Sequence, residues 1–333
     1  MSKFELISPQ EKVGRGILPY VTFPIINKCN LHCLYCGAAG EMTLSEDDVF
    51  QVEKLQEWVD AAEKLGVQKF RITGGEPLLH PDFRKIIFEV MKNAREVLIN
   101  TNGTLLMQYK DKWIDSPSNC KYVVNFHASK EETYDKITGT KGNYQVLKQG
   151  IELLASEQLL HRLNIVICQE NYNQLFDVID YCRSVGTDLK IQDVVSVPWA
   201  FNEWKTIYYD TSEIEEELEK KASYVKDHKY ARGFGTPTKI YTIDGVNITF
   251  KSIRNGSHYN LDNLCNNCKY YPCHEGVYDL FVFPDDKACV CNWTHIGNAS
   301  GNTLEEKLAD LIPKFQNTQY CPAEINKLSG MTL

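Results

Sequence analysis

Three cysteines lie within eight residues of one another, at Cys29, Cys33 and Cys36, in the segment NKCNLHCLYCGAAG. Thiolates are ligands for soft metals, and three in one loop can meet at a single metal centre without long-range folding. Their C-x3-C-x2-C spacing suits a loop that binds a [4Fe-4S] cluster. Three thiolates leave one of the four irons open, and an open iron can chelate the amine and carboxylate of a small molecule. Two alternatives are incidental buried thiols and a zinc site with His32 as fourth ligand.

The elements that must position this loop follow a regular pattern. Between residue 19 and about 195, short β-branched runs alternate with amphipathic segments at helical spacing, which is typical of βα units and a parallel sheet. Six units predict an α/β fold with a partial (β/α)6 TIM-like barrel, whose chemistry belongs on the loops that follow the strands. The cysteine loop follows the first strand. The strands are predicted at 19–25, 67–73, 96–102, 121–129, 162–168 and 188–195.

The regular alternation ends after residue 196. A charged helix is predicted over 212–230, then a hairpin that turns at Asp244-Gly245, and finally a helix over 303–315. The predicted division is a barrel at 1–196, a helical linker at 197–232 and a small β-rich, cysteine-rich domain at 233–333.

Composition limits the location and the partners of the chain. Its 333 residues are 43% hydrophobic and 24% charged, as in ordinary globular proteins. No apolar stretch approaches the roughly 18 residues of a membrane span, and the N-terminus lacks the apolar core of a secretory signal. We therefore expect a cytoplasmic protein without a membrane partner. Twelve cysteines are many for this compartment, and their clustering at 29–36 and 265–291 indicates metal ligation more than disulfides. A net charge of -8 argues against nucleic acid as the main partner.

A second motif, GGEP, lies at the end of the second predicted strand. Gly74 and Gly75 allow close backbone approach, Glu76 offers a carboxylate, and Pro77 stiffens the exit from the strand. By itself this segment is equally well explained as a plain turn from strand to helix. Its position beside the cysteine loop makes the two motifs together far more specific than either one.

The two motifs together resemble those of the radical S-adenosylmethionine (SAM) superfamily. The resemblance implies that Cys29, Cys33 and Cys36 ligate a [4Fe-4S] cluster whose open iron holds the amine and carboxylate of SAM. One electron, from a donor such as flavodoxin or ferredoxin, would cleave SAM to a 5′-deoxyadenosyl radical that abstracts a substrate hydrogen. Tyr35 would pack near the adenine.

The same resemblance implies further contacts with SAM at the strand ends. The backbone and acid of GGEP would hold the SAM amino group. The residues concerned are Gly74, Gly75 and Glu76. Thr101 and Asn102, in the segment INTNG, would face the ribose and carboxylate, although both could be simple turn formers. His127 departs from the serine-aspartate pair usual in the family, and either contacts SAM or substrate or is a satisfied histidine at a strand end.

One branch of the superfamily is especially similar over about residues 12 to 195, namely the GTP 3′,8-cyclases of molybdenum-cofactor biosynthesis. Four basic residues fall where the cyclases place basic groups around their triphosphate, and they would bind substrate here unless they are solvated surface charges. These are Arg15, Lys69, Arg71 and Lys190. The sequence also departs from the cyclases, because their C-terminal glycine pair is missing and the later cysteines are spaced differently.

Five further cysteines are clustered in the C-terminal third. Cys265 and Cys268 form C-x2-C, Cys273 follows, and Cys289 and Cys291 lie across a predicted hairpin. A structural zinc site is one interpretation. The resemblance is to the auxiliary-cluster extensions called twitch and SPASM domains, and it implies a second [4Fe-4S] cluster. Its expected ligands are Cys265, Cys268, Cys273 and Cys291, with Cys289 the expected spare and Cys321 a further candidate.

We therefore expect an enzyme that uses the adenosyl radical on a nucleotide, sugar or other small biosynthetic metabolite. The cofactor performs the hard chemistry, while the protein positions the substrate carbon and excludes water. The alternatives are a maturase of a ribosomally made peptide, the GTP 3′,8-cyclase itself, and a metal-binding module without turnover. Peptide maturases often carry an N-terminal leader-binding domain, and fewer than twenty residues precede the first predicted strand here, which disfavours the first alternative.

Overall fold

Eleven strands form one sheet in the order β12-β11-β1-β2-β3-β4-β5-β6-β9-β8-β7. The computed structural model describes residues 18–38, 49–194, 201–228, 238–252, 259–260, 277–291, 298–317 and 319–320. The strands of the sheet are β1 (Val21–Ile26), β2 (Lys69–Gly74), β3 (Glu96–Thr101), β4 (Cys120–Asn125), β5 (Leu160–Ile167), β6 (Asp188–Asp193), β7 (Tyr224–His228), β8 (Thr238–Ile243), β9 (Val246–Lys251), β11 (Leu280–Val282) and β12 (Ala288–Cys289). In a separate ladder, β10 (Tyr259–Asn260) pairs with β13 (Gln319–Tyr320).

Strands β1 to β6 are parallel and neighbour one another in sequence order, which confirms the predicted α/β partial barrel. Each of these six strands overlaps a predicted one. The fourth prediction, 121–129, runs too far, because β4 ends at Asn125. Beyond it, the side chain of His127 accepts a hydrogen bond from the Val166 amide of β5. The histidine ring thus takes over from the strand backbone as the acceptor of that amide.

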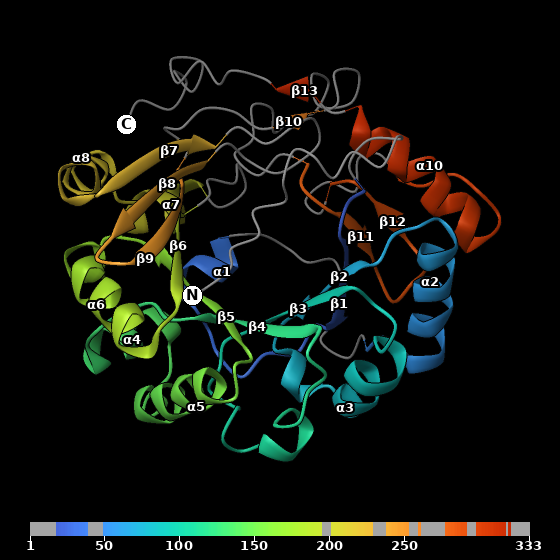
Figure 1. Cartoon of the computed structure of the whole chain (residues 1–333), viewed down its shortest axis with the longest axis horizontal. Coiled ribbons are helices and arrows are strands. Elements are labelled where there is room, and N and C mark those ends of the chain that lie inside the picture. The colour runs from blue at the N-terminus through green and yellow to red at the C-terminus, as the bar shows by residue number, and fades with distance from the viewer. Residues whose placement is uncertain are drawn as a thin grey trace.

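Most of the helices lie around the outside of the curved sheet, whereas α1 lies near the centre of the view (Figure 1). They are α1 (Leu34–Ala38), α2 (Val52–Lys64), α3 (Phe83–Lys85), α4 (Glu131–Thr138), α5 (Tyr144–Ser156), α6 (Leu175–Val185), α7 (Phe201–Ile207), α8 (Ser212–Lys221) and α10 (Leu304–Gln316). A π-turn (Ile86–Val90) continues α3, and short 3-10 turns lie at Pro77–Leu79, Lys110–Lys112 and Tyr172–Gln174. Among the described residues, every helix is too short or too polar to cross a membrane.

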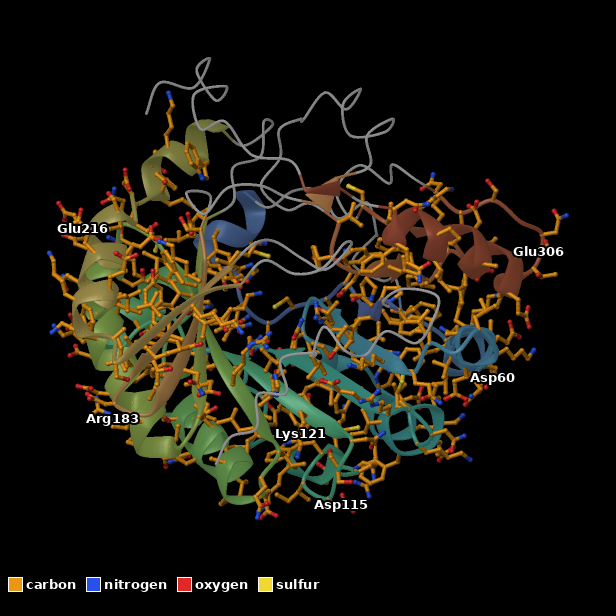
Figure 2. The ribbon with its side chains drawn as sticks, turned by 45° about the horizontal axis from the view of Figure 1, so that its top comes forward. Asp60, Asp115, Lys121, Arg183, Glu216 and Glu306 are labelled. Atoms are coloured by element: carbon orange, nitrogen blue, oxygen red, sulfur yellow. The ribbon has the colours of Figure 1, made fainter. Side chains whose placement is uncertain are left out.

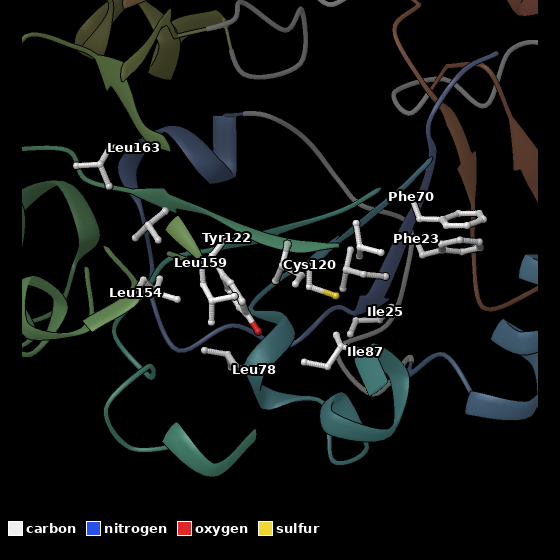
Figure 3. Close-up of a cluster of buried hydrophobic side chains, with 14 of the residues drawn as sticks. Phe23, Ile25, Phe70, Leu78, Ile87, Cys120, Tyr122, Leu154, Leu159 and Leu163 are labelled. Atoms are coloured by element: carbon white, nitrogen blue, oxygen red, sulfur yellow. The ribbon is translucent and has the colours of Figure 1, made fainter. Parts of the chain in front are cut away.

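The face of the sheet that meets these helices is apolar. Side chains alternate along a strand, so every second residue of β1 and β2 points into this core. Phe23 and Phe70 are fully buried there, with ring centroids 6.1 Å apart (Figure 3). Burying such a side chain contributes roughly 1.5–3 kcal/mol, so this layer supplies much of the driving force for folding.

The opposite face of the sheet is polar. Thr22 pairs with Arg71 across β1 and β2, and Lys190 of β6 lies between Asn164 of β5 and Thr249 of β9. These five residues alternate with core residues of the same strands, so they point away from the outer helices. The inner face of the barrel therefore presents polar and charged groups, as a binding site for a polar molecule requires.

The predicted hairpin is confirmed, since β8 and β9 are antiparallel and are joined by Asp244 and Gly245 with φ of 47° and 83°. Two positive φ values are typical of a type I′ turn. The hairpin does not stand apart from the barrel, because β9 pairs in parallel with β6. At the other edge, β11 pairs in parallel with β1. Strands from the second half of the chain thus extend the barrel sheet on both sides.

The helix predicted over 212–230 is wrong in its second half. Helix α8 ends at Lys221, and Ala222 has extended backbone angles. The residues that follow form β7, which pairs with the outer edge of β8. Tyr224 and Val225 have high strand propensity, so pairing with the edge of β8 outweighs the helical propensity of the preceding residues.

The final predicted helix is confirmed as α10. Thr303 caps it, because its side chain accepts from the Glu306 amide (3.2 Å) while the Glu306 carboxylate accepts from the Thr303 amide (3.2 Å). Lys64 at the end of α2 donates to Glu305 (2.6 Å). The reciprocal cap of Thr303 and Glu306 satisfies backbone amides in the first turn of α10 that have no partner within the helix.

Thr303→Ala should lower the free energy of unfolding by about 1 kcal/mol, because the capped amides lose their side-chain acceptor. Urea unfolding followed by circular dichroism measures this change. Thr303→Ser keeps the hydroxyl and should stay close to the wild type. Equal stability of all three proteins would contradict the capping role.

Candidate active site

The three cysteines of the first motif lie in and beside the loop between β1 and α1. Cys29 and Cys36 are exposed and Cys33 is half-buried. The loop is held from α4, since the His32 amide donates to the Thr138 carbonyl (2.9 Å). No three His, Cys, Asp or Glu side chains in the described part of the chain already form a metal cage. The donor chemistry is the evidence that these residues fit a cluster.

The charges of the three thiols influence one another. Burial raises the pKa of Cys33 to about 12, and negative charge at Cys36 and Cys29 adds to the rise. Partial desolvation of the exposed Cys29 and Cys36 likewise raises the pKa of each thiol, and negative charge at Cys29 adds to the rise at Cys36. Three thiolates here repel one another, and binding to cationic iron offsets that repulsion. Three soft donors in one loop therefore fit an iron-sulfur cluster.

The two glycines of the second motif bring the end of β2 onto the cysteine loop. The Gly75 amide donates to the Ile26 carbonyl (2.7 Å), and the Glu76 amide to the Lys28 carbonyl (2.9 Å). A β-carbon on Gly74, whose φ is +134°, would lie 2.1 Å from the Ile26 oxygen, and one on Gly75 would lie 2.3 Å from the Lys28 oxygen. Only glycine permits this approach.

The carboxylate of Glu76 ties β2 to β3. It is fully buried and accepts from the Leu78 amide (3.1 Å), the Thr101 hydroxyl (2.7 Å) and the Asn102 amide (2.7 Å). Burial raises its pKa to about 7, although the three donors favour the charged form. Both carboxylate oxygens face donors of the protein, so Glu76 and Thr101 brace the strand ends beside the loop.

Asn102 carries this bracing to the first cysteine. Its amide nitrogen donates to the Cys29 sulfur (3.8 Å) and to the Asn30 side-chain oxygen (2.8 Å). Its own oxygen accepts from the Thr104 amide (2.9 Å) and hydroxyl (2.7 Å), and Asn30 donates to that hydroxyl (2.8 Å). Sequence reasoning missed Asn30 and Thr104, although their places directly after Cys29 and the INTNG segment were a signal.

Tyr35 and His127 meet at the end of β4. The Tyr35 hydroxyl lies 2.6 Å from His127 Nε2, and the Val166 amide donates to His127 Nδ1 (3.3 Å). Asn171 donates to the His127 carbonyl (2.7 Å). His127 is only 2% exposed, and burial lowers its pKa to about 4. Both ring nitrogens therefore have partners within the protein, and the ring is neutral.

Two of the basic residues predicted to bind substrate, Arg71 and Lys69, form ion pairs with acids. Arg71 contacts Asp279 (2.7 Å), a buried carboxylate that also accepts from Thr22 (2.6 Å). Lys69 lies 3.6 Å from Glu96. One guanidinium nitrogen of Arg71, Nε, is buried without a hydrogen-bond partner among the described residues. Arg71 thus keeps one donor for another group.

Further cations share the inner face of the barrel. The positive charge of Lys190 stabilises the Asp279 carboxylate. Burial lowers the pKa of His161 to about 3, and the charges of Arg162, Arg71 and Lys121 lower it further. Sequence reasoning missed Arg162 and Lys121, although each occupies an inner-facing position of its strand. Figure 2 shows Lys121 among the central strands, whereas Asp60, Asp115, Arg183, Glu216 and Glu306 lie on the periphery.

Part of the predicted second cysteine group can be placed. Cys289 is fully buried among Phe281 and Phe283, and its thiol donates to the Cys291 carbonyl (3.2 Å). Burial raises the pKa of Cys289 to about 12, whereas Cys291 is partly exposed. The predicted site residues outside the described part of the chain are Arg15, Cys265, Cys268, Cys273 and Cys321.

Comparison with known proteins decides the family. A profile of the radical SAM superfamily matches residues 23–186. A probable GTP 3′,8-cyclase of Methanococcus aeolicus is 33% identical over 231 residues, which cover 68% of this chain and 74% of the relative. The chain belongs to the radical SAM superfamily. A second relative, the probable GTP 3′,8-cyclase of Methanothermobacter thermautotrophicus, is 28% identical over 286 residues, or 85% of this chain and 86% of its own.

Solved structures share the fold. Streptococcus suis SuiB bound to precursor peptide SuiA has a TM-score of 0.60 at 15% identity and covers 91% of this chain; the chain spans 65% of that structure. The anSMEcpe structure with bound AdoMet has a TM-score of 0.57 at 13% identity, over 90% of this chain and 81% of that one. At such identities the likeness concerns the fold alone. The family itself makes this chain a radical SAM enzyme and implies a [4Fe-4S] cluster and SAM.

Gly75→Ala should lose most of its iron and sulfide after anaerobic reconstitution, because the new β-carbon collides with the backbone that leads into the cysteine loop. Iron and sulfide analysis per protein chain measures the loss. Gly142→Ala is the control, since alanine there is strained by the φ of +77° alone and its β-carbon meets nothing within 4 Å. A full cluster content in Gly75→Ala would refute the argument from close approach.

Proposed function

We propose that this enzyme cleaves SAM reductively at a [4Fe-4S] cluster held by Cys29, Cys33 and Cys36, and abstracts a hydrogen from a small anionic metabolite. A nucleotide or a sugar phosphate has the required chemistry. One observation carries the proposal: the cysteine loop sits at the carboxyl ends of strands whose inner face is lined with cations. Reduced flavodoxin or ferredoxin would supply the electron.

The residues of the chain prepare this site in defined ways. When bound, the cluster and SAM supply the electron transfer and the adenosyl radical. Gly74 and Gly75 hold the loop against β2, and Asn102 donates to the Cys29 sulfur. The inner cations orient an anionic substrate below the loop, and the barrel wall shields the radical from water. The protein contributes position and electrostatics.

The paired charges argue for a substrate with modest negative charge. Arg71 is already neutralised by Asp279, whose carboxylate would repel a nearby phosphate chain. The unpartnered Nε of Arg71 can still donate one hydrogen bond to an anionic or carbonyl group. Lys190 and Arg162 add positive charge nearby. The small excess of positive charge around Arg71 suits a monophosphate or a carboxylate better than a triphosphate.

The GTP 3′,8-cyclase reaction is the second candidate. The relatives at 33% and 28% identity that carry this name favour it. The resemblance read from the sequence adds Lys69, Arg71 and Lys190, which it assigns to positions around the triphosphate of the cyclases. Against it stand the partners of these residues, since Arg71 pairs with Asp279 and Lys69 lies near Glu96. A direct binding comparison separates the two candidates.

We also propose a second [4Fe-4S] cluster, ligated by Cys265, Cys268, Cys273 and Cys291, within a C-terminal domain over 233–333 that follows a linker at 197–232. Support comes from the two cysteines that the structure describes. Cys291 is partly exposed, whereas the Cys289 side chain lies in an apolar cluster. Strand β11, which precedes this pair, lies beside β1 and therefore near the barrel.

Cys29→Ala should abolish formation of 5′-deoxyadenosine from SAM, because the radical-generating cluster loses a ligand. Cys268→Ala should retain SAM cleavage without substrate and impair only product formation. Anaerobic assays with dithionite and mass spectrometry measure both. Cys182→Ala, in a buried cysteine of α6, is the matched control and should behave as the wild type. Undiminished SAM cleavage in Cys29→Ala would refute the cluster assignment.

GTP should bind the wild type no more tightly than GMP, because Asp279 neutralises Arg71. Asp279→Asn should bind GTP several-fold more tightly, since it removes a buried negative charge without changing the shape. Isothermal titration calorimetry with GTP and GMP measures this difference. Asp285→Asn, which removes an exposed carboxylate of the same region, should have no effect. Much tighter binding of GTP than of GMP by the wild type would favour the cyclase.

A further inference from the structure

The orientation of the Asn102 side-chain amide can be assigned from its neighbours. The Thr104 backbone amide donates to one end of this group (2.9 Å), and a backbone amide can only donate. That end is therefore the oxygen, Oδ1, and the other end is the nitrogen, Nδ2, which carries two hydrogens. Nδ2 lies 3.8 Å from the Cys29 sulfur and 2.8 Å from the side-chain oxygen of Asn30. Asn102 is thus a donor toward the Cys29 sulfur.

Asn30 and Thr104 close a ring of three hydrogen bonds around this amide. Asn102 donates to Asn30 (2.8 Å), Asn30 donates to the Thr104 hydroxyl (2.8 Å), and that hydroxyl donates to Asn102 Oδ1 (2.7 Å). All three donors run in the same direction around the ring, so each bond supports the same orientation of Asn102. The backbone below is fixed as well, because the Asn102 amide donates to the fully buried Glu76 carboxylate (2.7 Å). The ring holds the second side-chain N–H of Asn102 toward Cys29.

These contacts use the full hydrogen-bonding capacity of the Asn102 side chain. An amide oxygen has two lone pairs, and here both accept from Thr104, once from its backbone amide and once from its hydroxyl. The two hydrogens of the nitrogen point to Asn30 and Cys29. Asn102 is only 9% exposed, so water competes little for these bonds. A contact between this amide and SAM would have to break one of the four.

We propose that Asn102 raises the reduction potential of the cluster held by Cys29, Cys33 and Cys36 through its hydrogen bond to the Cys29 sulfur. Asn30 and Thr104 are the positioning residues that orient it. The inference rests on the proposed function, because it takes Cys29 as a cluster ligand. Reduction adds negative charge that spreads onto the ligand sulfurs, and a donor at one of them stabilises the reduced state. Asn102 therefore serves the cluster rather than SAM.

The test is the midpoint potential of the reconstituted cluster, measured without SAM by a redox titration followed by electron paramagnetic resonance. The signal that changes when SAM is added afterwards identifies this cluster. Asn102→Ala removes the donor and should shift the potential to a more negative value. Thr104→Val keeps the backbone amide that orients Asn102 but opens the ring, and should shift the potential less in the same direction. The double variant should shift no further than Asn102→Ala, since Thr104 acts through Asn102.

Asn119→Ala is the matched control. Its side-chain nitrogen donates to the carbonyls of Met91 (3.1 Å) and Ala94 (2.8 Å), directly before β4 and therefore at the end of the strand opposite to the cysteine loop. This variant also loses two hydrogen bonds of an asparagine, and it should keep the wild-type potential. A shift as large as that of Asn102→Ala would mean that general loosening sets the potential, and it would overturn the inference.

The remaining outcomes separate this inference from the proposed function. A wild type without a reduced [4Fe-4S] signal would contradict the proposed function itself. An unchanged potential in Asn102→Ala would overturn the inference, and weaker SAM binding by that variant in equilibrium dialysis would then assign the amide to SAM. Shifts that add up in the double variant would overturn the positioning role of Thr104. If Asn102→Ala does not take up iron, Thr104→Val decides, and a wild-type potential in that variant overturns the inference.

Discussion

Two backbone hydrogen bonds between the end of β2 and the cysteine loop are the constraint on which the site depends. They join Gly75 to Ile26 and Glu76 to Lys28, and they leave no room for a β-carbon at Gly74 or Gly75. The loop is thereby held as an extension of the sheet. The GGEP motif has a structural reason, apart from any contact with SAM, because it fixes where the first cysteine lies.

Around this junction, the strand ends form a continuous polar brace. Glu76 ties β2 to β3, Asn102 ties β3 to Cys29, and His127 ties β4 to β5 and to Tyr35. Each group is buried and satisfied by partners from another strand, which is the arrangement that makes buried polar networks rigid. Residues that the family resemblance assigns to SAM thus also shape the loop itself. Rigid support of this kind keeps a reactive centre in position.

The two faces of the sheet have different roles: the outer face stabilises the fold, and the inner face carries the charged residues of the candidate site. Its outer face buries aromatic and aliphatic side chains under the helices, while its inner face carries the cations and the Arg71–Asp279 pair. Asp279 comes from the C-terminal third and reaches Thr22 and Arg71 of the first two strands. The later part of the chain therefore both extends the barrel sheet and sets the charge of its interior.

The sequence alone determined the features that depend on neighbours along the chain. Alternating and helical periodicities predicted the six parallel strands, the Asp244-Gly245 turn and α10. Sequence spacing grouped Cys29 with Cys33 and Cys36. All of these patterns lie within a few neighbouring residues, so the sequence contains them directly. Only the tertiary structure decided that YVKDH is a strand, that β9 and β11 join the barrel, and that Tyr35 meets His127, which is 92 residues away. The Thr22–Asp279 bond spans 257 residues. Such pairs depend on how the sheet curves, and the order of residues along the chain does not reveal that curvature.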